Sequence, residues 1–139
     1  MSSDSVAAID LGSNSFHMIV ARIENGRVQV LDRLREMVQL AAGLDERNRL
    51  SHAAQQRALA CLARFGQRVR HIPPARLRIV GTNTLRQARN SAEFVARAER
   101  VLGHKVEIVS GHEEARLIYL GVAHNVGDSG RCMVCHQGR

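Results

Sequence analysis

SVAAIDLGSNSFHMIVARIENGRVQVLDRLREMV, residues 5–38, predicts three consecutive strands joined by tight turns. Residues 5–10 form a short apolar run that stops at an acid and a glycine, as a buried strand does where it ends in a turn. Residues 16–23 and 27–38 have the pattern of two further strands. Asn25-Gly26 between them is a strong hairpin signal, because both residues tolerate positive φ. The N-terminal part of the chain is therefore predicted to be a three-stranded antiparallel meander.

The rest of the chain alternates predicted helices with predicted strands. Ser51 is a good N-cap for a long helix to about Arg70, which Pro73-Pro74 ends. The later elements are a strand at 77–81, a loop or short helix at 82–89, a helix at 90–102 with Asn90 and Glu93 as a capping box and Gly103 at its end, a strand at 105–109, and a helix from Ser110 to about His124. The order βββαβαβα predicts an α/β domain with the ribonuclease-H-like fold of the actin-like ATPase superfamily.

The charge of the chain favours a negatively charged partner. Lys and Arg total 20 against 13 for Asp and Glu, which gives a formal net charge of +7. Such an excess raises the local concentration of polyanions by long-range attraction. The aromatic residues are three Phe, one Tyr and no Trp, which is little material for stacking on nucleic-acid bases. We therefore expect a negatively charged partner that is not nucleic acid, and the charge alone leaves a membrane surface and a phosphate polymer open.

Residues 1–139 contain no run of about eighteen apolar residues and no basic, apolar N-terminal signal. We expect no transmembrane segment and a cytoplasmic location. The three cysteines, Cys61, Cys132 and Cys135, are an odd number with two of them crowded near the end of the chain, so reduced thiols are expected.

Three polar segments each follow a predicted strand. They are Asp10-Leu11-Gly12-Ser13-Asn14-Ser15, Gly81-Thr82-Asn83-Thr84-Leu85-Arg86 and Ser110-Gly111-His112-Glu113-Glu114-Ala115-Arg116. Ligands of α/β sheets bind beyond the carboxyl ends of strands, so these segments are expected to converge on one edge of the sheet.

The first segment has the composition of a phosphate-binding turn. Gly12, Ser13 and Asn14 allow backbone N–H groups to point into a concave turn, and Asp10 can orient a metal ion or a water. An ordinary polar β-turn is the alternative, and spacing alone favours it.

The other two segments offer a cation and an acid. Arg86 can bind phosphate oxygens bidentately, although a solvated arginine on an ordinary loop explains it equally well. Glu113 matches the capping-box spacing from Ser110, which leaves Glu114 to face the cleft as the catalytic candidate. The alternative is that both acids only complement the helix dipole.

These segments and their flanks resemble the exopolyphosphatase and guanosine pentaphosphate phosphohydrolase family. The resemblance is carried by residues 7–18, 81–88 and 108–118, and it extends in order over about residues 6–126. It implies an actin-like two-domain fold that hydrolyses the terminal phosphoanhydride of a polyphosphate chain with a divalent cation, usually Mg²⁺. It further implies that the full-length protein is a homodimer.

The resemblance also implies the role of each site residue. Asp10, Gly12, Ser13 and Asn14 match the first phosphate loop, with Asp10 as the metal ligand. Arg86 matches an arginine that grips the substrate, and Glu114 matches the glutamate that activates water. The favoured function is an exopolyphosphatase that releases terminal phosphate from inorganic polyphosphate. The alternatives are a guanosine pentaphosphate 5′-phosphohydrolase and a non-catalytic polyanion-binding module.

The end of the chain departs from the family pattern, in which a strand leads to a second, glycine-rich phosphate loop. Here Cys132-Met133-Val134-Cys135-His136 and three further residues follow, as a frameshift or premature stop would produce. We expect an N-terminal phosphate-binding lobe at 1–126 and a divergent tail at 127–139, with the truncated lobe inactive or weakly active. The tail matches the C-x-x-C-H haem pattern formally, but haem is not expected because too few residues remain to enclose it.

Overall fold

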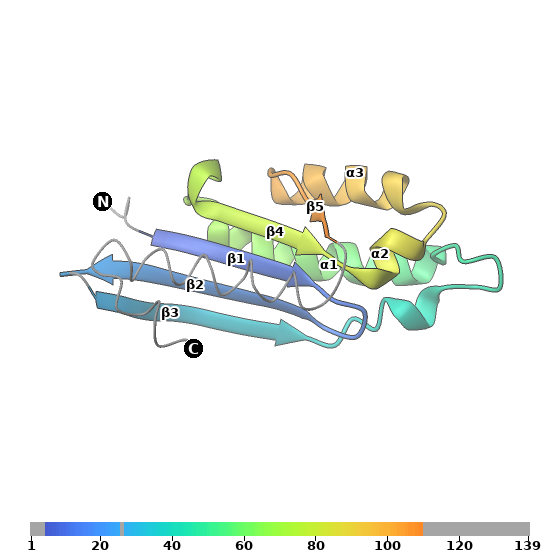
Figure 1. The fold of residues 1–139 in the computed structure, drawn as a ribbon, viewed down its shortest axis with the longest axis horizontal. Helices are drawn as coiled ribbons and strands as arrows, with labels where there is room; N and C mark the ends of the chain where they lie inside the picture. Colours follow the sequence, from blue (N-terminus) through green and yellow to red (C-terminus); the bar gives the residue numbers. More distant parts are fainter. Residues whose placement is uncertain (1–4, 26, 110–139) are drawn as a thin grey trace.

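The computed structural model describes residues 5–25 and 27–109, which form a five-stranded mixed sheet with helices packed on one face (Figure 1). The elements are β1 (Ser5–Leu11), β2 (Phe16–Glu24), β3 (Arg27–Glu36), α1 (His52–Val69), β4 (Leu77–Gly81), α2 (Asn83–Gln87), α3 (Ser91–Leu102) and β5 (Glu107–Ile108). Single 3₁₀ turns occur at Ala41–Gly43 and Pro74–Arg76. The predicted α/β class and the order of strands and helices as far as the fifth strand are confirmed. The helix predicted from Ser110 lies outside the described residues.

The strand order is β3-β2-β1-β4-β5, so β1 lies at the centre of the sheet. β1 is antiparallel to β2 and parallel to β4, and all of its residues are buried. A strand buried on both faces has a continuous apolar sequence, which is what residues 6–9 show. The predicted meander is confirmed, with Asn25 at a φ of 56° in the turn between β2 and β3.

The main core lies between the sheet and helices α1 and α3. One face of β1 contributes Ala7, Ile9 and Leu11, and α1 contributes Leu62 and Phe65 to the same cluster. The opposite face of the sheet carries a second, smaller cluster of buried residues: Val6, Ala8, Ile19 and Ala21. No helix of the described residues is long and apolar enough to span a membrane.

Local capping signals account for two of the helix ends. The Ser51 hydroxyl accepts a hydrogen bond from the Ala54 N–H at 3.1 Å, which confirms the predicted N-cap of α1. Gly103, with a φ of 76°, ends α3 and donates its N–H to the Glu99 carbonyl at 2.8 Å.

The capping box predicted from Asn90 and Glu93 is wrong. The Asn90 side chain makes no capping bond to α3. Its amide oxygen instead accepts from the Leu50 N–H at 2.8 Å, and its amide nitrogen donates to the Leu50 carbonyl at 3.1 Å. This pair of bonds ties the start of α3 to the residue just before the start of α1.

Ion pairs join β3 to α1 and β4 to β5. Arg64 binds Glu36 bidentately, with nitrogen–oxygen distances of 2.9 and 2.5 Å, and Arg68 binds Asp32, which lies earlier in β3. Arg78 on β4 binds Glu107 on β5 through two bonds of 2.8 Å. The hydrogen bonds from these arginines lower the pKa values of Glu36 and Glu107 below the ordinary 4.5.

These lowered pKa values predict a loss of stability in acid. Because each carboxylate has a lower pKa in the folded than in the unfolded chain, its stabilising effect is complete above pH 4.5 and is lost as the pH falls through the folded-state pKa. The pairs are exposed to solvent, so screening should keep the contribution of each pair to stability small. Urea unfolding of the wild-type chain, Glu36→Gln and Glu107→Gln should show a smaller stability loss in the variants as the pH falls below 4.5. Identical losses in all three proteins would contradict this assignment.

Candidate functional site

A cleft of about 310 Å³ lies where β1 and β4 end. Its lining comes from the end of β1 (Asp10), the β1–β2 turn (Gly12, Ser13, Asn14 and Ser15), the start of β2 (His17) and the residues after β4 (Thr82 and Asn83). The strand register explains this meeting, because Leu11 pairs with Gly81 in the parallel β1–β4 ladder. Gly12 and Thr82 therefore leave the sheet side by side. The structure thus brings together the first two of the three polar segments.

The turn between β1 and β2 is tight and depends on Gly12. The Gly12 N–H donates to the Ser15 carbonyl at 3.2 Å, which closes the turn on itself. A Cβ atom at position 12 would lie 2.9 Å from that same carbonyl oxygen. Because the obstacle is backbone, any side chain at this position would force the turn open.

The turn is also held from outside by a neighbouring segment. The Gln39 N–H donates to the Asn14 carbonyl at 2.7 Å, and the Ala41 N–H donates to the Ser13 carbonyl at 3.0 Å. In a trans peptide the N–H points opposite to the C=O of the same unit. The N–H groups of Asn14 and Ser15 consequently point away from residues 39–41.

A hydroxyl pair joins the two sides of the cleft. The Thr84 hydroxyl, which is buried in α2, donates to the Ser13 hydroxyl at 2.7 Å. This bond connects residues 71 positions apart in the sequence. It fixes the distance between the β1–β2 turn and the start of α2.

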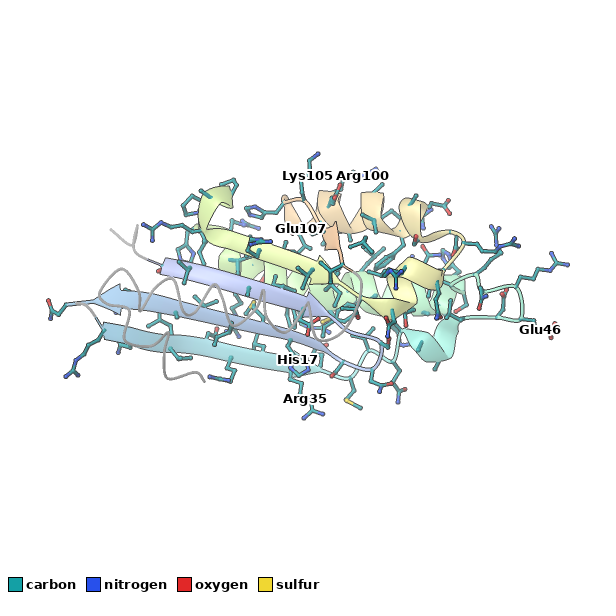
Figure 2. All side chains as sticks on the ribbon, viewed as in Figure 1. His17, Arg35, Glu46, Arg100, Lys105 and Glu107 are labelled. Carbon is teal, nitrogen blue, oxygen red and sulfur yellow. The ribbon has the colours of Figure 1, made fainter. Side chains whose placement is uncertain are left out.

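An acid and an imidazole lie opposite each other across the β1–β2 ladder. Asp10 is 7% exposed and pairs in register with His17, so both side chains project from the same face of the sheet. The His17 Nε2 lies 3.0 Å from the Ser15 hydroxyl. Figure 2 shows His17 near Arg35, its register partner on β3. The cleft therefore contains a carboxylate, an imidazole and several hydroxyl groups.

His17 was not predicted as a site residue. Phe16 and Met18 on either side of it belong to the core cluster, so strand alternation places His17 on the opposite face, with Asp10. A polar residue at that position, two residues after the first polar segment, was the signal that could have identified it.

The remaining predicted residues have separate outcomes. Arg86 lies in α2 and is exposed, and it is not among the residues that line the cleft. Glu113, Glu114 and the tail residues Cys132, Cys135 and His136 lie outside the described residues. Within residues 5–25 and 27–109, no three His, Cys, Asp or Glu side chains are grouped to hold a metal ion. Asp10 is the one carboxylate among the described residues that line the cleft.

Comparison of the sequence with known proteins gives consistent matches. The model of the Ppx/GppA phosphatase family matches residues 19–138. A guanosine-5′-triphosphate,3′-diphosphate pyrophosphatase of Vibrio cholerae serotype O1 is 52% identical over 99% of this chain and 28% of its own length. A protein of the same name from Vibrio vulnificus is 53% identical over 95% of this chain and 27% of its own length. The chain thus spans about 28% of the length of the curated relatives it matches.

Solved structures agree in fold. The Ppx/GppA family member of Aquifex aeolicus superposes with a TM-score of 0.73 and 28% identity, over 85% of this chain and 39% of that protein. An exopolyphosphatase from Cytophaga hutchinsonii superposes with a TM-score of 0.74 and 28% identity, over 85% of this chain and 38% of that protein. The predicted ribonuclease-H-like, actin-like fold is therefore confirmed, and this chain belongs to the Ppx/GppA phosphatase family.

Proposed function

We propose that this chain supplies the phosphate-binding lobe of a hydrolase that removes the terminal phosphate of guanosine pentaphosphate. The observation that carries the proposal is the cleft formed by the Gly12–Ser15 turn and Thr82, in a chain 52% identical to proteins named for guanosine-5′-triphosphate,3′-diphosphate. The sequence alone favoured inorganic polyphosphate as the substrate. The names of these relatives support the nucleotide better.

The cleft has the donors that a phosphate group requires. The N–H groups of Asn14 and Ser15 point away from the 39–41 segment, and the Ser13, Ser15 and Thr82 hydroxyl groups belong to lining residues. Oriented backbone N–H groups and hydroxyls bind phosphate oxygens without needing a charge of their own. The net charge of +7 adds long-range attraction for a polyanion.

The oxygen atoms around Asp10 are suitable ligands for a magnesium ion. Mg²⁺ prefers hard oxygen ligands and is commonly held by one or two carboxylates together with substrate phosphates and water. Asp10 offers such a carboxylate, and the hydroxyls of Ser13 and Ser15 lie in the same cleft. When bound, the ion would neutralise charge on the phosphate chain.

Glu114 and Arg86 complete the proposed chemistry. The Glu114 carboxylate accepts a proton from a water molecule, whose oxygen attacks the terminal phosphorus. The phosphoanhydride bond breaks, the bridging oxygen leaves with the nucleotide, and the products are phosphate and guanosine tetraphosphate. Arg86 is proposed to bind phosphate oxygens of the substrate through its guanidinium group.

An exopolyphosphatase is the second candidate. The Cytophaga hutchinsonii structure with a TM-score of 0.74 bears that name, and a cleft that binds phosphate oxygens through backbone groups does not by itself require a nucleoside.

Substrate turnover separates the two candidates. Residues 1–126 should be joined to the remaining part of the Vibrio cholerae relative, with that relative unaltered as the control, and phosphate release should be measured from guanosine pentaphosphate and from polyphosphate. We expect kcat/KM to favour guanosine pentaphosphate by about tenfold or more. Preference for polyphosphate would support the exopolyphosphatase, and binding of both without release would support a polyanion-binding module.

The 139-residue chain alone should hydrolyse either substrate weakly or not at all.

The general-base assignment can be tested in the same chimera. Glu114→Gln should keep substrate binding but lower turnover by roughly 10²–10⁴-fold, because glutamine cannot accept the proton from water. Glu113→Gln is the matched control and should have little effect, since glutamine still makes a capping bond. If Glu113→Gln abolishes turnover and Glu114→Gln does not, the two roles are reversed.

The bond between Ser13 and Thr84 should couple the two sides of the cleft. A double-mutant cycle with Ser13→Ala and Thr84→Val should give a coupling energy of about 0.5–1.5 kcal/mol in urea unfolding, because either change removes the same hydrogen bond. Ser13→Ala combined with Ser91→Ala is the control and should be additive. Additivity in both cycles would mean that the bond makes no contribution in solution.

A further inference from the structure

Residues 38–41, which we call the brace, do not line the cleft but hold the β1–β2 turn in place. Two N–H groups of the brace, from Gln39 and Ala41, donate to the carbonyls of Asn14 and Ser13. These are the bonds that direct the N–H groups of the turn away from the brace. The geometry of the turn therefore depends on the geometry of the brace.

The brace adopts a conformation that its own sequence does not favour. Gln39 has a φ of 54°, in the left-handed region that L residues with a side chain rarely adopt. Its neighbours Val38 and Leu40 are 4% and 0% exposed, so both are anchored in the core on either side of it. An unfavourable backbone conformation persists only where the surroundings impose it.

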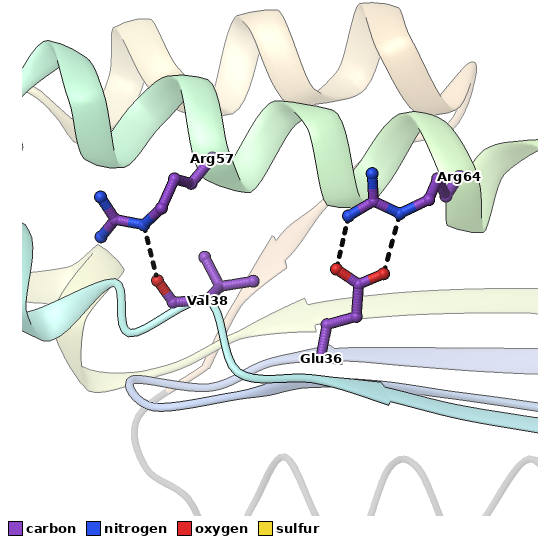
Figure 3. A network of polar contacts seen from close by, with 4 residues as sticks. All are labelled: Glu36, Val38, Arg57 and Arg64. Carbon is purple, nitrogen blue, oxygen red and sulfur yellow. Dashed lines mark hydrogen bonds and ion pairs between the residues drawn. The ribbon is translucent and has the colours of Figure 1, made fainter.

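Arg57 on α1 supplies the polar part of that restraint (Figure 3). Its Nε donates to the Val38 carbonyl at 3.2 Å, and one of its terminal nitrogens donates to the Gln39 carbonyl at 3.4 Å. The planar guanidinium thus spans two successive carbonyls of the brace. Seven residues further along the same helix, Arg64 binds Glu36 at the end of β3. The two arginines hold the end of β3 and the brace against α1.

We propose that Arg57 is a positioning residue for the cleft. It acts through Gln39 and Ala41 on the carbonyls of Asn14 and Ser13, and so fixes the direction in which the N–H groups of the turn point. The effect of Arg57 on phosphate binding rests on the function proposed above. The effect of Arg57 on the conformation of the turn is independent of that function, so the two effects can be measured separately.

Amide hydrogen exchange tests the effect of Arg57 on the turn in the 139-residue chain. In Arg57→Ala the Gln39 amide, which donates to Asn14, should exchange at least about tenfold faster, because the brace opens locally more often. The melting temperature should change by no more than about 2 °C, since Arg57 is exposed. Arg68→Ala is the matched control, because it removes the same charge from the same helix but breaks a bond to Asp32 instead. Unchanged Gln39 exchange in Arg57→Ala would overturn the proposal.

Binding of tripolyphosphate with Mg²⁺ tests the consequence for the cleft. Arg57→Ala should raise the Kd about five- to tenfold, and Arg68→Ala should leave it unchanged. Arg57→Lys keeps the charge but cannot donate to both carbonyls in the same geometry. It should therefore recover less than half of the affinity that Arg57→Ala loses. Full recovery by lysine would show that charge alone matters and would overturn the positioning role. A wild-type chain that shows no binding, with fast Gln39 exchange in Arg57→Ala, would count against the proposed function and leave the brace established.

Discussion

β1 is hydrogen-bonded along both edges and buried on both faces, and this arrangement places the strand ends between which the cleft lies. A shift of one residue in its register would turn Asp10 into the core and Ile9 into the cleft, because side chains alternate along a strand. Burial of Ala7, Ile9 and Leu11 against the helices therefore specifies the register strongly. Since Leu11 pairs with both Phe16 and Gly81, the same register places the two polar segments next to each other.

α1 packs into the core with one side and binds β3 and the brace with another. Its buried stripe, which includes Leu62 and Phe65, packs under the sheet. Arginines on its flank bind β3 and the brace, so the helix fixes the backbone that follows β3 as well as the strand itself.

Burial, the largest cause, together with nearby Glu36, raises the pKa of Cys61 on this helix to about 12. Cys61 is therefore a protonated packing residue and not a nucleophile.

Features that depend on neighbouring residues were predictable from the sequence, and features that depend on distant ones were not. The turn at Asn25, the N-cap at Ser51 and the end of α3 at Gly103 each involve groups only a few residues apart. Asn90 has an equally clear local signal, yet its side chain binds Leu50, 40 residues away. The two hydrogen bonds that it makes to the Leu50 backbone replace the single capping bond that the local pattern predicts. The support of the turn by Gln39 also depends on how separate segments pack, which no local pattern encodes.

The long separation between the two sides of the cleft has a consequence for how the protein folds. The β1–β2–β3 meander contains mainly contacts between neighbours in sequence and can form early, whereas β4 must pair with β1 across about 70 intervening residues. Closing such a loop is slow compared with forming a hairpin. As the chain leaves the ribosome, β1 therefore presents one edge of unpaired backbone N–H and C=O groups until β4 has been synthesised. During that interval the nascent chain is vulnerable to strand-to-strand association with other chains, and the cleft is completed only after that edge has been covered.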